Sequence, residues 1–261
     1  MNQILAVAIT VTILAAVTFA VVALLRLEKP WLQPIAVLRA VIQLGLLSII
    51  LLNVVSNGIF VGAFLVVMIG AATWVVIQRL ALTLRDAPRI AASLAVTSAI
   101  PVVVVFATGA VQLSPRYVLA VGGIVIGNAM TVSTLMGRSL SSQFASNWEE
   151  IEAWLALGAT PRRSAVRLVR SAASTSLIPS TDQTRTTGIV TLPGAFVGAI
   201  FAGASPLAAA EFQLIVLAAI LVTGALTAAL FSWFYGAPAV LPINGDLRLP
   251  RVADVAPVAA G

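Results

Sequence analysis

The chain has 261 residues, of which 60% are hydrophobic and only 9% are charged, and its formal net charge is +6. An average soluble domain has about 25% charged residues, so this composition excludes an ordinary soluble protein and indicates an integral membrane protein. The chain has no Cys and no His, which excludes disulfides, thiol chemistry, the usual zinc sites and histidine-based acid–base catalysis.

Apolar runs in chain order predict the membrane-spanning elements. Seven runs are long enough to cross a bilayer: 3–25, 35–54, 58–78, 90–111, 117–137, 185–204 and 210–235. The first run lacks a basic leading region and a small-residue cleavage pattern, so we expect a retained helix rather than a signal peptide. The sequence therefore predicts an all-α integral membrane protein with about seven transmembrane helices in a single domain over residues 1–236.

The distribution of basic residues predicts the orientation. Thirteen of the fifteen Lys and Arg residues fall in segments on one side, whereas Arg116 falls on the other side and Arg39 inside the second run. The positive-inside rule places that basic side, with the C-terminus, in the cytoplasm and the N-terminus outside. Orientation also explains the net charge, so we expect a lipid bilayer and no nucleic acid as partner. Residues 237–261 are rich in Pro and predict a flexible cytoplasmic tail.

The loop between the fifth and sixth runs, residues 138–184, contains a charged stretch that cannot lie in lipid. The pattern Ser146-x-x-Glu149 is a capping box and predicts a helix that starts at Asn147. Three glutamates crowd the first turns of this helix, where the helix dipole favours negative charge. Gly158 ends the helix, since glycine accepts the left-handed conformation of a C-terminal cap. We therefore expect the first arm of a helical hairpin here.

Thr160 and Pro161 predict the start of a second helix, with Thr as the N-cap and Pro at the first helical position. Its basic face would comprise Arg163, Arg167 and Arg170. The first helix has an apolar stripe of Trp148, Ile151, Trp154 and Leu155. Such a stripe needs a partner, which argues against the alternative of a plain solvated connector.

Five stretches resemble a known family. They are "RAVIQL" (39–44), "GNAM" (127–130), "EAWLALG" (152–158), "LALGATP" (155–161) and "LIPSTDQTRTTGIVTLPGAFVGAIFAGASP" (177–206). The third is similar to the EAA-x-x-x-G loop of ATP-binding-cassette transporter permeases. Together the five resemble the FetB-like permeases, the membrane subunits of an iron exporter with plant relatives linked to aluminium tolerance.

The resemblance implies that the hairpin is a coupling helix seated in a groove of a separate cytoplasmic ABC ATPase. The residues that would couple to this subunit are Trp148, Glu149, Glu150, Ile151, Glu152, Trp154, Leu155, Gly158, Thr160 and Pro161. The chain's single lysine, Lys29, has no glycine-rich turn beside it, so ATP and Mg²⁺ are expected in the partner and no cofactor on this chain. We expect a non-catalytic homodimer of permeases in the cell (inner) membrane.

Polar residues at membrane depth are candidates for the substrate pathway or for gating. They are Arg39, Gln43, Asn128, Met130, Asp182, Arg185 and Pro193. A charge at the centre of a bilayer costs about 3 kcal/mol or more unless it is paired or hydrated. Three roles for Arg39 stay open: a functional site, an ion pair with Asp182 or Glu211, or a side chain that reaches the cytoplasmic surface.

Other residues in these runs predict helix packing and a break. We expect Asn128 to line the pathway and Thr131 to form hydrogen bonds between helices. The glycine pairs Gly123-x-x-x-Gly127 and Gly194-x-x-x-Gly198 predict close helix packing. Asp182 and Arg185 are spaced to pair on a helix, and Pro193 is expected to kink the sixth span.

The sequence leaves the cargo open. Iron(II) commonly takes imidazole and carboxylate ligands, and the chain has no His and no acidic residue near mid-membrane, so any metal would be held weakly or as a complex. Alternatives are an ABC permease for a non-metal solute such as a nucleotide sugar, or a membrane scaffold without transport activity. A membrane-embedded enzyme would need a catalytic pair at membrane depth, and the sequence offers none.

Overall fold

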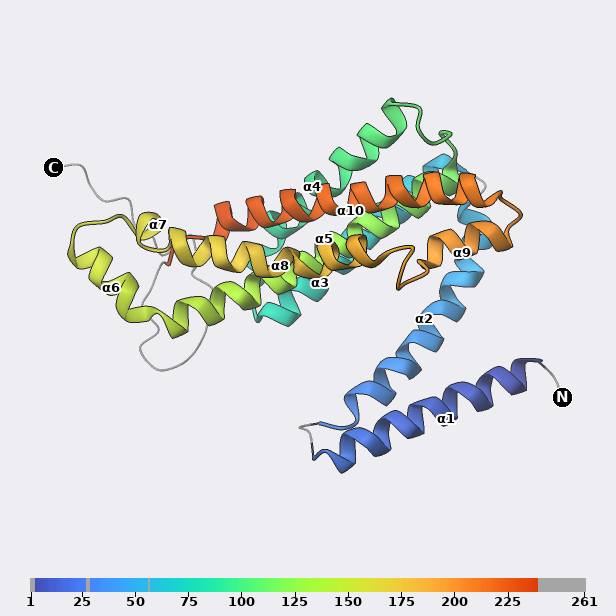
Figure 1. The fold of residues 1–261 in the computed structure, drawn as a ribbon, viewed down its shortest axis with the longest axis horizontal. Coiled ribbons are helices and arrows are strands. Elements are labelled where there is room, and N and C mark those ends of the chain that lie inside the picture. Colours follow the sequence, from blue (N-terminus) through green and yellow to red (C-terminus); the bar gives the residue numbers. More distant parts are fainter. Residues whose placement is uncertain (1–2, 27–28, 56, 239–261) are drawn as a thin grey trace. The chain divides into compact units, whose positions relative to one another are not determined.

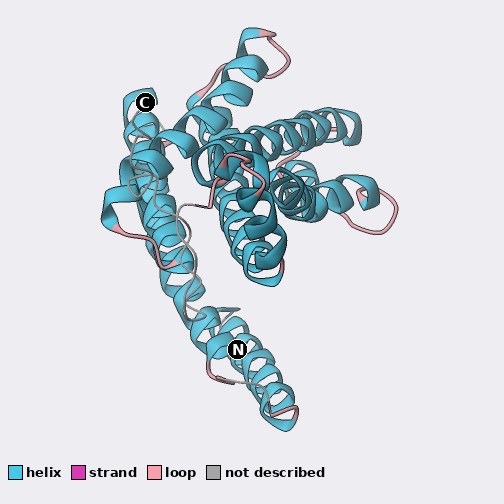
Figure 2. Ribbon diagram, turned by 90° about the vertical axis from the view of Figure 1, so that its left-hand side faces the viewer, coloured by secondary structure: helices cyan, strands magenta, loops and turns pink. Residues whose placement is uncertain are grey.

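The computed structural model describes residues 3–26, 29–55 and 57–238, and the chain divides into two compact units, Met1–Asn57 and Gly58–Gly261. Figure 2 shows helices joined by loops, with no strand in the described ranges. The predicted all-α class is confirmed, and six of these helices are long and apolar enough to cross a membrane. Of the predicted tail at 237–261, all but residues 237 and 238 lies outside the described residues.

The first unit is a hairpin of α1 (Gln3–Leu24) and α2 (Leu32–Val54). The rings of Phe19 and Trp31, 4.5 Å apart, pack where the two helices are joined. None of the side chains described in this unit is buried, so its apolar surface is suited to lipid. Its helical hydroxyls donate to carbonyls four residues earlier, at 2.8–2.9 Å, in Thr10, Thr12, Thr18 and Ser48.

The second unit is a bundle built around one long helix, α5 (Pro115–Ser146), which packs against α3, α4, α8 and α10. Its other elements are α3 (Gly58–Leu80), η1 (Leu84–Asp86), α4 (Ala87–Ala107), α6 (Trp148–Ala156), α7 (Pro161–Ser164), α8 (Val166–Thr186), α9 (Gly194–Phe201) and α10 (Pro206–Tyr235). Figure 1 shows α6 and α7 at the end of this unit where α10 finishes, and α9 at the end where α10 begins.

The two longest helices start with the same Ser-Pro signal. Ser114 accepts a hydrogen bond from the backbone N–H of Tyr117 at 3.4 Å, and Ser205 accepts one from Ala208 at 3.2 Å. In both helices a proline follows the serine, at the first helical position, where its missing N–H costs nothing. The starts of α5 and α10 are therefore set by local sequence.

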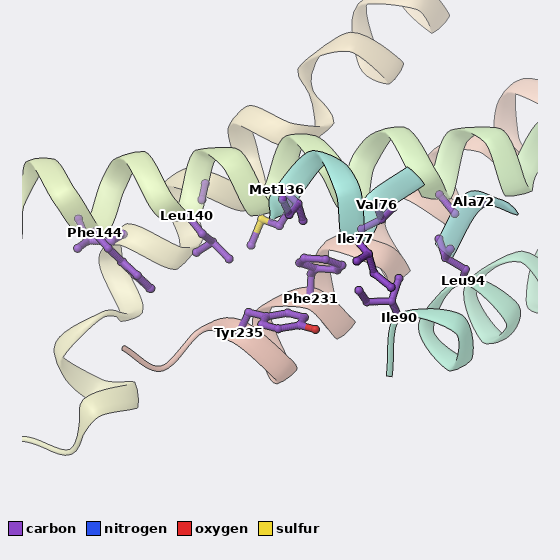
Figure 3. Close-up of a cluster of buried hydrophobic side chains, with 14 of the residues drawn as sticks. Ala72, Val76, Ile77, Ile90, Leu94, Met136, Leu140, Phe144, Phe231 and Tyr235 are labelled. Carbon is purple, nitrogen blue, oxygen red and sulfur yellow. The ribbon is translucent and has the colours of Figure 1, made fainter. Parts of the chain in front are cut away.

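The apolar core of this unit lies between α3, α4, α5 and α10, toward the end that carries α6 (Figure 3). The rings of Phe231 and Tyr235 pack in its centre, with centroids 4.9 Å apart and planes tilted by 36°. The core continues into the hairpin, because Ile151 of α6 and Leu168 of α8 belong to the same buried cluster. Burial of such side chains provides about 1.5–3 kcal/mol each, so the hairpin is fastened to the bundle by the core itself.

The predicted sixth span, 185–204, is not one helix. α8 ends at Thr186, residues 187–193 leave the helix, and α9 has only eight residues. The non-helical segment turns back on itself, with the N–H of Gly188 donating to the carbonyl of Thr191 at 2.9 Å. α8 and α9 together lead from the hairpin end of the bundle to the opposite end (Figure 1), so this crossing is a broken one. Pro193 is the N-cap of α9 rather than a kink within a helix.

The glycines that pack closely are not those in the predicted motifs. Nothing lies within 4 Å of a Cβ built on Gly127, Gly194 or Gly198, and a Cβ on Gly123 meets ordinary van der Waals contact. Within the described residues, three of the four glycines in the predicted Gly-x-x-x-Gly motifs therefore make no close helix contact. Among the described glycines, the closest approach between two helices is instead at Gly137 of α5, where a Cβ would lie 2.4 and 2.7 Å from the two terminal methyls of Leu80. This glycine lets α3 and α5 meet.

Gly137→Val should lower stability, because its side chain would collide with Leu80, which is itself buried in the core. Overpacking of this kind costs about 1–3 kcal/mol. The matched control is Gly70→Val on α3, where a Cβ meets nothing within 4 Å. Thermal unfolding in detergent should give a lower midpoint for the first variant alone. Equal midpoints would show that α3 and α5 do not pack through Gly137.

The predicted orientation is tested by single cysteines, since the native chain has none. Ala156 in α6 and Ala204 after α9 are both exposed and lie at opposite ends of the second unit (Figure 1). Ala156→Cys should react with an impermeant maleimide only from the cytoplasmic side, and Ala204→Cys only from outside. Labelling of both from one side would contradict the predicted topology.

Candidate functional site

The inner face of α6 packs on the protein's own core. Ile151 is fully buried, and Trp148 and Leu155 are half-buried against the same apolar cluster. Ile151 therefore has no surface left to anchor another subunit, whereas the coupling role of the partly exposed Trp148 and Leu155 stays a prediction. All three hold α6 in a defined orientation against α5 and α8.

The outer face of α6 is the surface left for a partner. Trp154 is 50% exposed and Leu157, just beyond the helix end, is 81% exposed. Glu149 and Glu152 are also exposed and carry negative charge to the same short helix. Leu157 was not among the predicted residues; its signal in the sequence is an apolar side chain directly before the capping glycine. We call Glu149, Glu152, Trp154 and Leu157 the hairpin tip.

Gly158 ends α6 as predicted, with a backbone φ of +84°. Its N–H donates to the carbonyl of Leu155 at 2.9 Å, and the N–H of Ala159 donates to that of Trp154 at 3.0 Å. These two bonds form a Schellman cap, which needs a left-handed residue at this position. The turn between α6 and α7 therefore depends on glycine.

The predicted capping box is wrong. α5 runs on to Ser146, and Asn147 both ends α5 and precedes α6, without a side-chain cap bond. Asn147 instead donates through its amide to the carbonyl of Gln143 at 2.9 Å. Ile151 holds α6 against the core, so the helix starts at Trp148 without a Ser–Glu cap.

The second arm of the hairpin is two helices rather than one. Thr160 precedes α7 in an extended conformation, and Pro161 takes the first helical position as predicted. The hydroxyl of Thr160 forms no cap bond. The chain bends at Ala165, so Arg163 in α7 is separated from the basic residues of α8. Thr160 and Pro161 are both exposed.

One ion pair joins the two arms. Arg167 of α8 donates through Nε to Glu150 of α6 at 2.9 Å and through Nη2 to its second carboxylate oxygen, a bidentate arrangement. Arg167 also reaches the amide oxygen of Asn147 at 3.5 Å. The hydrogen bond from Arg167, with its charge, lowers the pKa of Glu150 below the ordinary value of 4.5. Glu150 is thus a link within this chain.

From this pair, α8 runs into the bundle along α5 and α10. Near the hairpin, Gln143 of α5 donates to Ser171 at 3.2 Å. Further in, Ser180 donates to the amide oxygen of Asn128 at 3.0 Å, and the amide nitrogen of Asn128 donates to the carbonyl of Ile220 at 2.9 Å. Asn128 therefore connects α5, α8 and α10 through both ends of its amide.

The hydrogen bonds between helices that were expected of Thr131 are formed by Asn128 instead, and the pathway role of Asn128 stays a prediction. Asn128 forms the bonds between helices, whereas Thr131 is exposed and donates to Gly127 of its own helix at 3.0 Å. Met130 packs half-buried against the apolar cluster, as a core side chain. The polar contact at this depth is thus structural, and a sequence without distances does not separate the two roles.

The last turns of α8 expose a polar face. Asp182 and Arg185 are both exposed, and they do not form the predicted pair: the ion pairs of the described residues are Arg89–Asp86 and Arg167–Glu150. Beyond them, Ile189 and Val190 of the non-helical segment are 89% and 76% exposed. α8 thus presents charged groups at the depth where the helix is interrupted.

Buried hydroxyls form a second polar feature, of which the sequence interpretation noted Ser133 but not the residues of α4 and α10. The oxygens of Ser93 and Ser98 in α4, Ser133 in α5 and Thr227 in α10 are buried without a hydrogen-bond partner in the described part of the chain. These three helices pack pairwise against one another. The signal was present as hydroxyl residues four apart inside apolar runs, such as Ser93 with Thr97.

The remaining candidates do not form a metal centre. Arg39 and Gln43 are both exposed, one turn apart on α2, and belong to the first unit, so their role stays a prediction. Within the described residues, no three His, Cys, Asp or Glu side chains gather to hold a metal ion. The polar atoms available to a cargo are mainly hydroxyl, amide and carbonyl oxygens.

Reversing the charge at position 150 should loosen α6. In Glu150→Lys, repulsion from Arg167 should raise hydrogen–deuterium exchange of the amides of α6, and the swap Glu150→Lys/Arg167→Glu should restore protection. Glu152→Lys is the matched control, because Glu152 lies on the same helix without an ion pair. Similar exchange in Glu150→Lys and Glu152→Lys would show that the pair does not hold the hairpin.

The same pair predicts a pH dependence. The pKa of Glu150 is lowered in the folded state. The contribution of the Glu150–Arg167 pair to stability is therefore complete above the ordinary pKa of 4.5, and it is lost as the pH falls through the lower folded-state pKa. The protection factors of the α6 amides, which correct for the intrinsic effect of pH on exchange, should therefore fall on acidification below about pH 4.5 in the native protein. Glu150→Gln should remove this fall in protection.

Comparison with known proteins assigns the family. The UPF0014 family, described as an uncharacterised protein family, matches residues 4–237. The UPF0014 membrane protein YjkA of Bacillus subtilis is 34% identical over 201 residues, 76% of this chain and 80% of the relative. The UPF0014 membrane protein STAR2 of Oryza sativa subsp. japonica is 31% identical over 213 residues, 81% of this chain and 74% of the relative.

A third relative is the "probable iron export permease protein FetB" of Escherichia coli, 33% identical over 135 residues, which are 52% of each chain. No solved structure matches. The predicted resemblance to FetB-like proteins is confirmed, and the apolar helices make this a multi-pass membrane protein. The chain belongs to the UPF0014 family of membrane proteins.

Proposed function

We propose that the chain is the membrane-spanning permease subunit of an ATP-binding-cassette transporter and works with a separate cytoplasmic ATPase. The observation that carries this proposal is the continuity of α8. It starts at the hairpin, is tied to α6 by the Glu150–Arg167 pair, and reaches the middle of the bundle at the Ser180–Asn128 bond. A force applied at the hairpin tip has a helical path into the membrane.

The two faces of α6 support this role. The inner face is held by Ile151 in the core, whereas the hairpin tip offers the aromatic Trp154 and the aliphatic Leu157 beside two carboxylates. Binding energy at protein interfaces concentrates in a few buried aromatic and apolar side chains, and exposed charges mainly orient the encounter. The tip thus combines apolar anchors with acidic steering groups on a helix that cannot rotate freely.

The proposed pathway follows the exposed polar face of α8. Asp182 and Arg185 are costly in lipid, and non-helical backbone such as residues 187–193 is tolerated at membrane depth only against protein or water. A second copy of the chain that faces this surface would enclose both in a shared polar passage. Broken helices of this kind line substrate sites in many transporters.

For the cargo we propose a metal ion or metal complex that is exported, by analogy with FetB, a probable iron export permease. The chain offers oxygen donors rather than imidazole or thiolate, which suits transient contact with a hard cation or a hydrated complex. ATP-driven movement of iron in vesicles that contain the permease and its ATPase tests this cargo. Movement of another solute, or ATPase binding without transport, would favour the alternatives.

Removing the exposed anchors should release the ATPase. Trp154→Ala/Leu157→Ala deletes two apolar contacts worth about 2 kcal/mol each at a typical interface, about 4 kcal/mol together, so affinity should fall by about 700-fold. Trp74→Ala is the control, because Trp74 is 52% exposed on α3, away from the hairpin. Co-purification with the ATPase and ATP hydrolysis stimulated by the permease measure the effect. Full binding by the double variant would refute docking at the tip.

A further inference from the structure

A cavity of about 430 Å³ lies between the end of α3 and the second half of α5. Its α5 wall is a single helical face, since its residues are spaced three or four apart: Arg138, Ser141, Ser142, Ala145 and Ser146. α3 contributes Arg79 and Leu80, and Ala81 closes the cavity where the chain leaves the helix with a φ of +50°. This volume is within the range of small-molecule sites, about 300–1,000 Å³.

The polar groups that line this cavity are free to bind. Neither Arg79 nor Arg138 takes part in the ion pairs formed by the described residues. The hydroxyls of Ser141, Ser142 and Ser146 have no hydrogen bond to any other described residue. The lining has no carboxylate. The cavity therefore offers two guanidinium groups and three hydroxyls to a ligand rich in acceptors, which is the chemistry of a phosphate group.

The cavity lies at the depth of lipid headgroups. α5 has 32 residues and so is about 48 Å long, well beyond the hydrocarbon thickness of about 30 Å. Arg138 is the first charged residue after the apolar stretch 117–137, and Arg79 is next to the last residue of α3. Both guanidinium groups thus stand where an apolar helix surface ends, which is the level of the lipid phosphates.

We propose that this cavity binds the headgroup of an anionic phospholipid from the leaflet next to the α6–α7 hairpin. The two arginines pair with the phosphate, the serine hydroxyls bond to its oxygens and to the headgroup, and the acyl chains follow the apolar surface between α3 and α5. A basic pocket between transmembrane helices on the basic side of a membrane protein suits such lipids. The proposal does not depend on the transport role.

A second basic cavity nearby lacks these free groups. It measures about 370 Å³ and is lined by Arg162, Arg170 and Trp233, among others. There Arg162 already donates to the carbonyl of Trp233 at 2.6 Å and lies 4.6 Å from the centre of its indole ring. One of its two guanidinium groups is therefore engaged within the protein, and the cavity between α3 and α5 is the better lipid site.

The test uses the purified full-length protein in a neutral detergent and measures thermal unfolding and lipid adducts in native mass spectrometry. Phosphatidylglycerol should raise the unfolding temperature and form adducts more than phosphatidylcholine with the same acyl chains, and inorganic phosphate should do neither. Arg79→Gln/Arg138→Gln should bind phosphatidylglycerol about 30-fold more weakly, from about 1 kcal/mol for each basic group. Arg79→Lys/Arg138→Lys keeps the charges and should retain part of the affinity, which separates lost binding from lost folding.

The charge-matched control is Arg85→Gln/Arg163→Gln, which removes two exposed arginines from the same predicted side but outside both cavities. This control should bind the lipid as the native protein does. Equal loss of affinity in the control would show diffuse attraction to the basic surface and overturn the site. An unchanged response in Arg79→Gln/Arg138→Gln would overturn it as well. An equal response to inorganic phosphate would assign the cavity to a soluble anion and refute the lipid proposal.

Discussion

Polar side chains on a helix that enters a lipid-embedded bundle need hydrogen-bond partners, and α8 is the helix of the second unit for which this requirement matters most. On the inner side of α8 the partner is Asn128, whose amide accepts a hydrogen bond from Ser180 and donates one to the carbonyl of Ile220. A single amide thus holds three helices in register, because each unmet polar group in an apolar surrounding costs free energy. On its outer side Asp182 and Arg185 have no such partner within the described residues. The inner face of α8 thus has a hydrogen-bond partner within the described residues, whereas the charged groups on its outer face have no ion-pair partner there.

The hairpin shows the same division between an inner and an outer face. Ile151 is part of the bundle core, so the position of α6 is fixed by packing rather than by the flexible turns around it. The Glu150–Arg167 pair adds a second attachment, between α6 and α8. Exposed ion pairs contribute little stability, so the core carries most of the free energy and the pair sets the orientation.

α5 passes through three environments and brings them into contact. Its first half lies in the bundle, with Gly122 facing Leu65 closely and Asn128 bonded to its neighbours. At Gly137 it meets Leu80 of α3, and beyond Arg138 one face continues the core through Leu140 while the opposite face lines the cavity with α3. The helix then ends at the hairpin. One continuous helix thus belongs to the cavity, the core and the start of the hairpin.

Local patterns in the sequence predicted the elements whose cause is local. The apolar runs gave the six long helices because length and hydropathy decide which segments suit a bilayer, and Gly158 predicted the end of α6 because glycine alone tolerates the left-handed conformation without cost. The family also followed from short motifs, since these are properties of the chain itself.

Tertiary contacts decided the rest. An apolar stripe on a short helix reads the same whether it faces the protein or a partner, so only the fold showed that Ile151 is inside while Trp154 and Leu157 are outside. Ser180 of the polar helix α8 finds its partner in Asn128, 52 residues away in the sequence, and no local pattern predicts that contact. Whether a glycine allows close helix packing likewise depends on the side chain opposite it, as Leu80 is at Gly137. A sequence fixes what each residue is able to do, and packing determines which of those abilities is used.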